Sequence, residues 1–320
     1  MTQLLQAAII FGTVILFGAI GEIITEKCGN LNLGVPGIMY LGGIAGLVGT
    51  FFYESSCTEP NVFLCVVIAL ICSITASVLG GLIYSFLTIT LRANQNVTGL
   101  TLTIFGSGVA NFFGGSLNKL AGGVGQISVS ATSSGFCKTL PFLRNVSVFS
   151  SLGFMVYLAV ALAICATLFL TKTRRGLNLR AVGENPATAD AAGINVTRYK
   201  YLATCIGAAI SGLGGLYYTM DYIKGTWAND GSIESLGWLA VALVIFARWK
   251  PVHAIWGSYL FGILFWVYLY IPGLSRSSME LFKALPYVVT FIVLIAVSIH
   301  KHRESNGPAA LGLSYFREDR

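Results

Sequence analysis

The chain has 320 residues, of which 55% are apolar and only 10% are charged, and its net charge is +7. A soluble domain carries about 25% charged residues, so this composition excludes an ordinary soluble globular protein and predicts a single membrane domain over residues 1–320. The excess of cations does not indicate nucleic-acid binding, because the lysines and arginines lie between apolar runs, where they orient a membrane protein.

Nine apolar segments are candidates for crossing the membrane, so the predicted fold is an all-α polytopic protein of about nine transmembrane helices. The third would extend about 45 Å as a helix, more than a ~30 Å hydrocarbon core, so we expect it to tilt, kink or project, with Gly80-Gly81 as the weak point. The seventh is too short to span alone, and both a span and a re-entrant turn stay open. In chain order the segments are 4–20, 33–52, 62–91, 97–115, 149–171, 200–220, 236–247, 252–271 and 283–299.

The distribution of cations predicts the orientation of the chain. Nine crossings place the two termini on opposite sides of the membrane. With the amino terminus outside, fourteen of the twenty Lys and Arg residues lie inside. Because cytoplasmic loops carry an excess of Lys and Arg, we expect the amino terminus outside and the carboxyl terminus in the cytoplasm. No cation precedes Lys27, so no cleavable signal peptide is expected.

The segment Gly29–Gly37 brings three glycines, Pro36, Asn30 and Asn32 to the start of the second span. Irregular backbone at this depth is tolerated only where it is buried in protein or lines a cavity. Two interpretations stay open. Either the segment is a broken helix end beside a solute path, or it is a tight turn with glycine packing.

The fourth span carries polar but uncharged side chains that repeat at helical spacing. Such a face could pass a neutral, hydroxyl-rich solute along by hydrogen bonds, and Phe105 could stack on a base. The alternative is hydrogen bonding and packing between helices. The candidate substrate path comprises Asn32, Thr98, Thr101, Phe105, Ser107 and Asn111.

Small residues recur at spacings that let two helix backbones approach closely in a membrane. We interpret these ridges as packing surfaces within the chain, with a moving helix pair or a subunit contact as the alternative. The three ridges are Gly42 with Gly46, then Gly106 with Ala110 and Gly114, and finally Gly207 with Ser211 and Gly215.

A polar island between two apolar runs, residues 172–200, holds six of the twenty Lys and Arg residues. Its middle predicts a short helix, in which Glu184 or Asn185 is the cap, Pro186 suits the first turn and Gly193 ends the helix in a left-handed conformation. We expect a partner protein to bind this helix. The alternative interpretation is that the segment is only a solvated connector between two spans. The candidate docking residues are Glu184, Asn185, Pro186, Ala187, Asp190, Ala192 and Gly193.

Several motifs are absent from the sequence. It has no GxxxxGK[ST] phosphate-binding loop, no HExxH and no GxSxG. We therefore expect no enzyme activity, no catalytic residues, no metal ligands and no cofactor bound by this chain. The scarcity of acidic residues within the spans argues against an ion-coupled transporter, although sodium sites built from carbonyls and hydroxyls would escape this test. Cys57 and Cys137 lie in predicted outer loops, and a disulfide between them stays open.

Two segments carry a resemblance to a known family. Residues 26–39 (EKCGNLNLGVPGIM) resemble the early signature of bacterial ABC-importer permeases for nucleosides and simple sugars, the branched-chain amino acid and ribose-type family. Residues 176–200 (GLNLRAVGENPATADAAGINVTRYK) look like the cytoplasmic coupling region of the same family.

The resemblance implies a set of partners and a location. The partners would be an ATP-binding subunit that takes residues 184–193 in a cleft, a second permease that is the same or different, and an extracytoplasmic solute-binding lipoprotein. The location would be the bacterial cell membrane, and ATP would be bound by the partner subunit.

Our leading hypothesis is the permease subunit of a nucleoside importer that works by alternating access. A ribose- or galactose-type sugar permease is the first alternative, and an ion-coupled secondary transporter is the alternative from a different class.

Overall fold

The computed structural model describes residues 2–120, 127–139, 152–228, 230–271, 273, 275–299 and 307–316. These residues form helices and connections, and their only strand-like pairing is an isolated bridge between Ser128 and Thr226. The predicted all-helical character is confirmed. The α-helices are α1 (Thr2–Glu26), α2 (Val35–Ser56), α3 (Val62–Ser85), α4 (Gln95–Leu120), α5 (Ser130–Phe136), α6 (Phe154–Lys172), α7 (Arg174–Glu184), α8 (Pro186–Ala191), α9 (Val196–Tyr217), α10 (Ser232–Phe246), α11 (Pro251–Trp266), α12 (Arg276–Lys283) and α13 (Leu285–Ile299).

Seven helices of the described chain are long and apolar enough to cross a membrane. Three of them gain length from a short π or 3₁₀ segment at the carboxyl end. The other two predicted spans correspond to α10 and α13, which have 15 residues each. A helix of that length extends about 22 Å, less than a ~30 Å hydrocarbon core, so the count of nine crossings stays a prediction. The seven spans are Thr2–Glu26, Val35–Ser56, Val62–Thr90, Gln95–Ser116, Phe154–Lys172, Val196–Tyr222 and Pro251–Tyr270.

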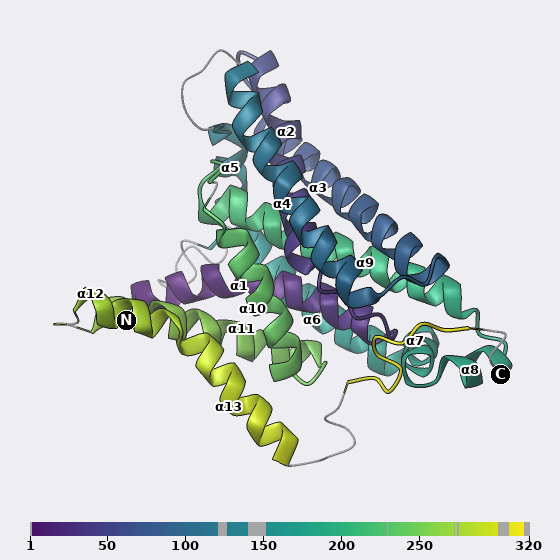
Figure 1. The fold of residues 1–320 in the computed structure, drawn as a ribbon. Helices are drawn as coiled ribbons and strands as arrows, with labels where there is room; N and C mark the ends of the chain where they lie inside the picture. Colours follow the sequence, from purple (N-terminus) through teal and green to yellow (C-terminus); the bar gives the residue numbers. More distant parts are fainter. Residues whose placement is uncertain are drawn as a thin grey trace.

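Helix α1 runs through the middle of the bundle, with α2, α3 and α4 on one side and α11 on the other (Figure 1). Helix α10 crosses α1 and also packs on α2, where a Cβ at Gly237 would lie 2.6 Å from the Pro36 Cα atom. It is buried continuously from Phe11 to Glu26. A helix that is apolar on nearly all sides is buried, and most of the buried side chains of α1 are apolar or glycine. The exceptions are Thr13, Thr25, Glu22 and Glu26, and the two glutamates accept hydrogen bonds from Asn32 and Trp249. The most central element of the fold is therefore the first apolar run of the sequence.

The small-residue ridges pack within the chain, as predicted. A Cβ atom at Gly42 would lie 2.5 Å from the carbonyl oxygen of Gly212, and one at Gly207 would lie 2.5 Å from that of Gly21. At Gly106 the nearest atom would be the carbonyl oxygen of Gly37, at 2.3 Å. Backbones approach this closely only where side chains are absent. The glycines thus set the spacing of α2 to α4 and α9, and of α1 to α9.

The prediction that the third span has its weak point at Gly80-Gly81 is wrong. Both residues lie inside the continuous helix α3, and the departure from α geometry comes later, as a π-helical segment over Phe86–Thr90. Gly81 faces the side chain of Ala208 on α9, so this glycine permits a close helix contact. Gly80 likewise lies against Leu41 of α2, so two neighbouring helices support α3 where an isolated glycine pair would weaken it. Arg92, with a φ of 57°, then reverses the chain toward α4.

Candidate functional site

Helices α7 and α8 form a compact cap at one end of the bundle. The Thr173 side chain accepts a hydrogen bond from the Gly176 N–H at the start of α7. Asn185 caps α8 by accepting a hydrogen bond from the Thr188 N–H at 3.0 Å, and Pro186 follows in the first turn. Gly193, with a φ of 82°, comes just after the end of α8. The predicted short helix is confirmed, and of the two proposed caps it is Asn185 that acts.

Helix α8 is attached through one face and open on the others. Ala189 is 3% exposed and packs against the bundle. The Ile194 N–H donates to the Ala189 carbonyl at 3.0 Å, which folds the chain back into α9. The remaining candidate residues are exposed or half-exposed, and nothing lies within 4 Å of a Cβ built at Gly193. The outer surface of α8 is therefore small, smooth and free of bulky side chains.

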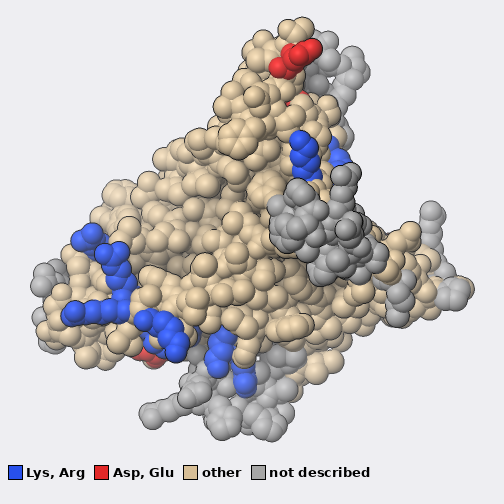
Figure 2. All heavy atoms as spheres, turned by 180° about the vertical axis from the view of Figure 1, so that it is seen from behind, with Lys and Arg blue, Asp and Glu red and all other residues tan. Residues whose placement is uncertain are grey.

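Cations surround this cap. Figure 2 shows Lys and Arg gathered at the end of the molecule that α7 and α8 occupy. Lys27 lies at the same end. Burial lowers the pKa of its ammonium, and the nearby Glu184 carboxylate acts in the opposite direction. A surface of this kind attracts acidic partners and anionic lipid headgroups.

The connection between α1 and α2 is a buried turn, which agrees with the second of the two interpretations of Gly29–Gly37. Its backbone groups are paired with side chains from three helices. The Leu31 N–H donates to Gln95 Oε1 at 2.7 Å and the Asn32 N–H donates to Glu22 Oε1 at 3.0 Å. The Tyr84 hydroxyl donates to the Leu31 carbonyl. A turn with all these partners is held firmly in place.

Asn32 itself is 2% exposed, and its side-chain oxygen accepts the Gly34 N–H at 3.0 Å. It therefore closes its own turn. A contribution of Asn32 to a solute path stays a prediction.

The carboxyl-terminal segment, residues 307–316, crosses this end of the bundle next to α7 and α8 (Figure 1). The Ala310 N–H donates to the Gly183 carbonyl at 3.0 Å, and the Gly312 N–H donates to the Gly29 carbonyl at 3.2 Å. Sequence reasoning missed this role, because a polar tail without periodicity gives no signal of where it docks. The segment links the α1–α2 turn to the end of α7.

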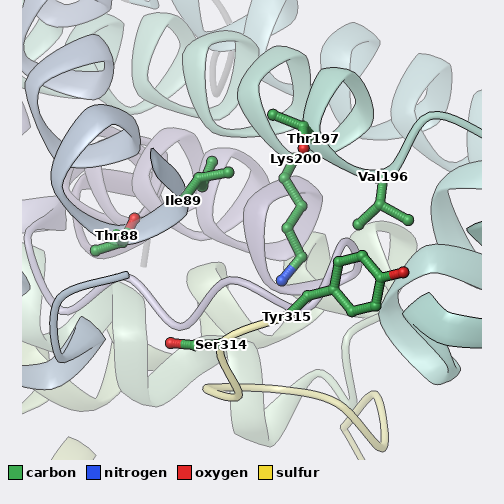
Figure 3. Close-up of a pocket in the computed structure, with 7 residues that line it drawn as sticks. All are labelled: Thr88, Ile89, Val196, Thr197, Lys200, Ser314 and Tyr315. Atoms are coloured by element: carbon green, nitrogen blue, oxygen red, sulfur yellow. The ribbon is translucent and has the colours of Figure 1, made fainter. Parts of the chain in front are cut away.

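Tyr315 connects the same segment to α8. Its hydroxyl donates to Asp190 Oδ2 at 2.9 Å. In Figure 3 the Lys200 side chain extends from α9 toward Ser314 and Tyr315. These residues enclose a cavity of about 20 Å³, which admits a water molecule and excludes a nucleoside or a sugar.

The other predicted path residues all lie on α4. Thr101 and Phe105 are exposed, while Thr98, Ser107 and Asn111 are half-exposed. The Thr98 and Thr101 hydroxyls donate to carbonyls of their own helix, at 2.8 Å each. The packed face of α4 is a different one, formed by glycines and small residues. Helical spacing places Thr98, Thr101 and Phe105 on one side of the packed face of α4 and Ser107 and Asn111 on the other side. The structure does not bring these five residues together with Asn32, and their role in transport stays a prediction.

The opposite end of the bundle carries Cys57 and Cys137, both free thiols. Burial and the nearby Asp221 carboxylate raise the pKa of the Cys137 thiol. The Lys224 ammonium lies 3.2 Å from Asp221 Oδ1, which balances that buried carboxylate. In the part of the chain that the structure describes, no group of three or more His, Cys, Asp and Glu side chains is placed to hold a metal ion.

The chain matches, over residues 4–298, a protein family described as the permease component of branched-chain amino acid transport systems. Three relatives cover nearly the whole chain. The nucleoside ABC transporter permease NupC of Lactococcus lactis is 30% identical over 97% of this chain and 95% of its own length. The guanosine ABC transporter permease NupQ of Bacillus subtilis is 28% identical over 100% and 98%. TsgC13 of Haloferax volcanii, which bears the name of a glucose ABC transporter permease, is 31% identical over 98% of both chains.

In each of these three organisms a second ABC transporter permease is also similar to this chain, at 24% to 27% identity. No solved structure matches the chain. The family match begins in the first turn of α1, takes in α2 to α12 and includes nearly all of α13. The seven apolar spans are those of a multi-pass protein of the cell membrane. The chain therefore belongs to the family of branched-chain amino acid transport permease components.

Proposed function

We propose that this chain is the permease subunit of an ATP-driven ABC importer that moves nucleosides into the cell. The observation that carries the proposal is similarity over nearly the full length to permeases named for nucleosides and for guanosine. The solute would pass by alternating access, in which close-packed helices re-pack between an outward-open and an inward-open arrangement. A simple sugar is the second candidate solute, favoured by the relative with a glucose name.

Uptake by cells that express the whole transporter tests the choice of solute. We expect labelled guanosine to accumulate and an excess of unlabelled nucleosides to compete with it, while glucose and ribose leave the uptake unchanged. Accumulation of glucose that nucleosides do not inhibit would contradict the nucleoside assignment and support the sugar assignment. Cells without this chain serve as the control.

We infer that α8 is the docking element for the ATP-binding subunit, with its contact surface at Glu184, Asn185, Pro186, Ala187, Asp190, Ala192 and Gly193. Caps at both ends keep the helix short and rigid, and its small side chains suit insertion into a cleft. Movement of the ATP-binding subunits on binding ATP would be passed to the bundle through Ala189 and the hydrogen bonds of residues 307–316.

Substitution on the outer face of α8 tests this docking. We expect Ala187→Trp to lower co-purification of the ATP-binding subunit at least tenfold, because a large ring occupies the space of the partner's cleft. Thr58→Trp is the control, since Thr58 is exposed at the opposite end of the bundle. If the Ala187→Trp variant still co-purifies normally with the ATP-binding subunit and supports wild-type uptake, α8 is not the contact.

We further propose that two different permeases assemble around the path and that an extracytoplasmic lipoprotein delivers the solute. The support is the recurrence of two similar permeases in each organism of the three relatives. Co-expression of a tagged form of this chain with the second permease should yield both chains after tag purification, whereas a complex of two copies of this chain would contradict the mixed assembly.

The alternative of a different class is an ion-coupled secondary transporter. Proteoliposomes that hold this chain alone should not concentrate nucleosides when a sodium or proton gradient is imposed. Concentration under those conditions would overturn the importer proposal, because no ATP-binding subunit would be present.

A further inference from the structure

A groove of about 940 Å³ opens between α6 and α9, beside α7. Its walls within the bundle are apolar and come from Leu162, Ala166 and Phe169 on α6 and from Leu202 and Ile206 on α9. Leu202 and Ile206 are each about half exposed, so the groove faces outward. In a membrane-spanning bundle, an outward apolar groove contacts lipid.

The rim of the groove at the α7 end is basic. Arg174 and Arg175 from α7 and Arg198 from α9 all line it, and their side chains are exposed. None of the described residues that line the groove is acidic. The three arginines form no ion pair with any other described residue. Their charge is therefore available to an anion bound at this rim.

Two helices also begin at this rim. Arg174 and Arg175 stand in the first turn of α7, and Asn195 is the cap of α9. The free N–H groups and the positive dipole ends of both helices favour negative charge at the same place. A hydrogen bond of 3.1 Å from Asn178 to the Tyr199 hydroxyl joins α7 to α9 and fixes their spacing there.

The groove is long enough to hold an acyl chain across one leaflet. It follows α9 from Asn195 to Ile210, which is about 22 Å of helix. This exceeds half of a ~30 Å hydrocarbon core. An acyl chain can lie along α6 and α9 while its headgroup stays at the basic rim.

We propose that this groove binds one anionic phospholipid, with the phosphate at Arg174, Arg175 and Arg198 and an acyl chain between α6 and α9. The choice of an anionic lipid follows from the combination of an apolar groove with an unpaired basic rim at its end. The inference rests on the proposed function in placing α7 on the cytoplasmic side, and Ala192 and Gly193 of the proposed docking surface also line the groove. Lipid retention is measured on this chain without the ATP-binding subunit and without transport, so failure of one proposal is distinguishable from failure of the other.

Lipid retention by the full chain tests the site. The purified protein is stripped of lipid in detergent, then exchanged with nanodiscs of phosphatidylglycerol and phosphatidylcholine, and retained lipid is counted by native mass spectrometry. We expect one phosphatidylglycerol to remain in preference to phosphatidylcholine. The variant R174Q/R198Q should bind phosphatidylglycerol roughly 30-fold more weakly, because it lacks two of the cations that attract the lipid phosphate.

Matched variants separate a specific site from general surface charge. K172Q/K250Q removes the same charge from exposed cations outside the groove, and we expect it to retain the lipid. Ile206→Trp narrows the apolar wall and should also lower retention, while Ile104→Trp, on the exposed face of α4, should not.

Three results would overturn the proposal. They are equal retention of both lipids, equal losses in the groove and control variants, and a photocrosslink from position 206 to a second permease instead of to lipid. The last result would identify the groove as a subunit interface.

Discussion

Gly183 and Gly193 stand at the two ends of the same short region for different physical reasons. A Cβ at Gly183 would lie 2.3 Å from the carbonyl oxygen of Lys27, so its lack of a side chain lets α7 contact the α1–α2 turn. Gly193 has open space around it and a φ of 82°, so its role is to turn the chain. One glycine is required by packing and the other by backbone conformation.

This difference predicts the effects of two alanine substitutions on stability. Gly183→Ala should lower the free energy of unfolding by about 3 kcal/mol, because backbone atoms must move. Gly193→Ala should cost only about 1 kcal/mol, the strain of a left-handed alanine. Thermal unfolding in detergent compares the two. Equal losses would mean that the α7 contact with the turn relaxes freely.

At the scale of elements, α8 is positioned by a segment far from it in sequence. Tyr315 donates to Asp190, Ala309 N–H donates to Glu184 Oε2 at 3.3 Å, and Gln95 donates to the Leu313 carbonyl at 3.5 Å. The Arg92 guanidinium lies 4.4 Å from the centre of the Phe316 ring. The carboxyl-terminal segment thus joins α8 and the end of α7 to the start of α4, so a movement of α8 is coupled to the membrane helices.

Removal of one hydrogen bond tests this coupling. Tyr315→Phe should speed amide hydrogen exchange over residues 186–193 by about fivefold, which corresponds to a net loss of about 1 kcal/mol. Leu313→Ala is the control, because its side chain is 60% exposed and only its carbonyl is used. Unchanged exchange in Tyr315→Phe would show that α8 is held by Ala189 and its caps alone.

At the scale of the whole molecule, the charge pattern and the helix arrangement lead to one orientation. The basic end carries α7, α8, the α1–α2 turn and residues 307–316, while the opposite end carries the α2–α3 connection and α5 (Figure 1). Because cytoplasmic surfaces are rich in Lys and Arg, we expect the basic end in the cytoplasm.

Cysteine accessibility in intact cells measures this orientation. In a background with Cys57→Ser and Cys137→Ser, a membrane-impermeant maleimide should label Thr58→Cys and leave Ala187→Cys unlabelled until the cells are opened. The reverse labelling pattern would show that the bundle has the opposite orientation in the membrane. In that orientation α8 could not contact an intracellular partner. Both positions are exposed at opposite ends, so they form a matched pair.

Sequence patterns predicted local structure well and contacts poorly. The caps and the left-handed glycine around α8 were readable because they depend on neighbouring residues. The weak point expected at Gly80-Gly81 was wrong, because α9 supports that stretch of α3 through Ala208, and no local pattern records this contact. The docking of Tyr315 on Asp190 joins residues 125 positions apart, so only the folded chain could reveal it.

The sequence by itself determined that this is a helical membrane protein, where its apolar segments run, and that a short capped helix stands in a basic island. These properties follow from composition and from interactions between near neighbours. The tertiary structure decided which helix lies at the centre, that the segment Gly29–Gly37 is a buried turn, and that a basic, apolar-walled groove lies between α6 and α9. Such features arise when segments that are distant in sequence pack against each other and exclude lipid and water from the space between them. This packing depends on the shapes of the segments in three dimensions.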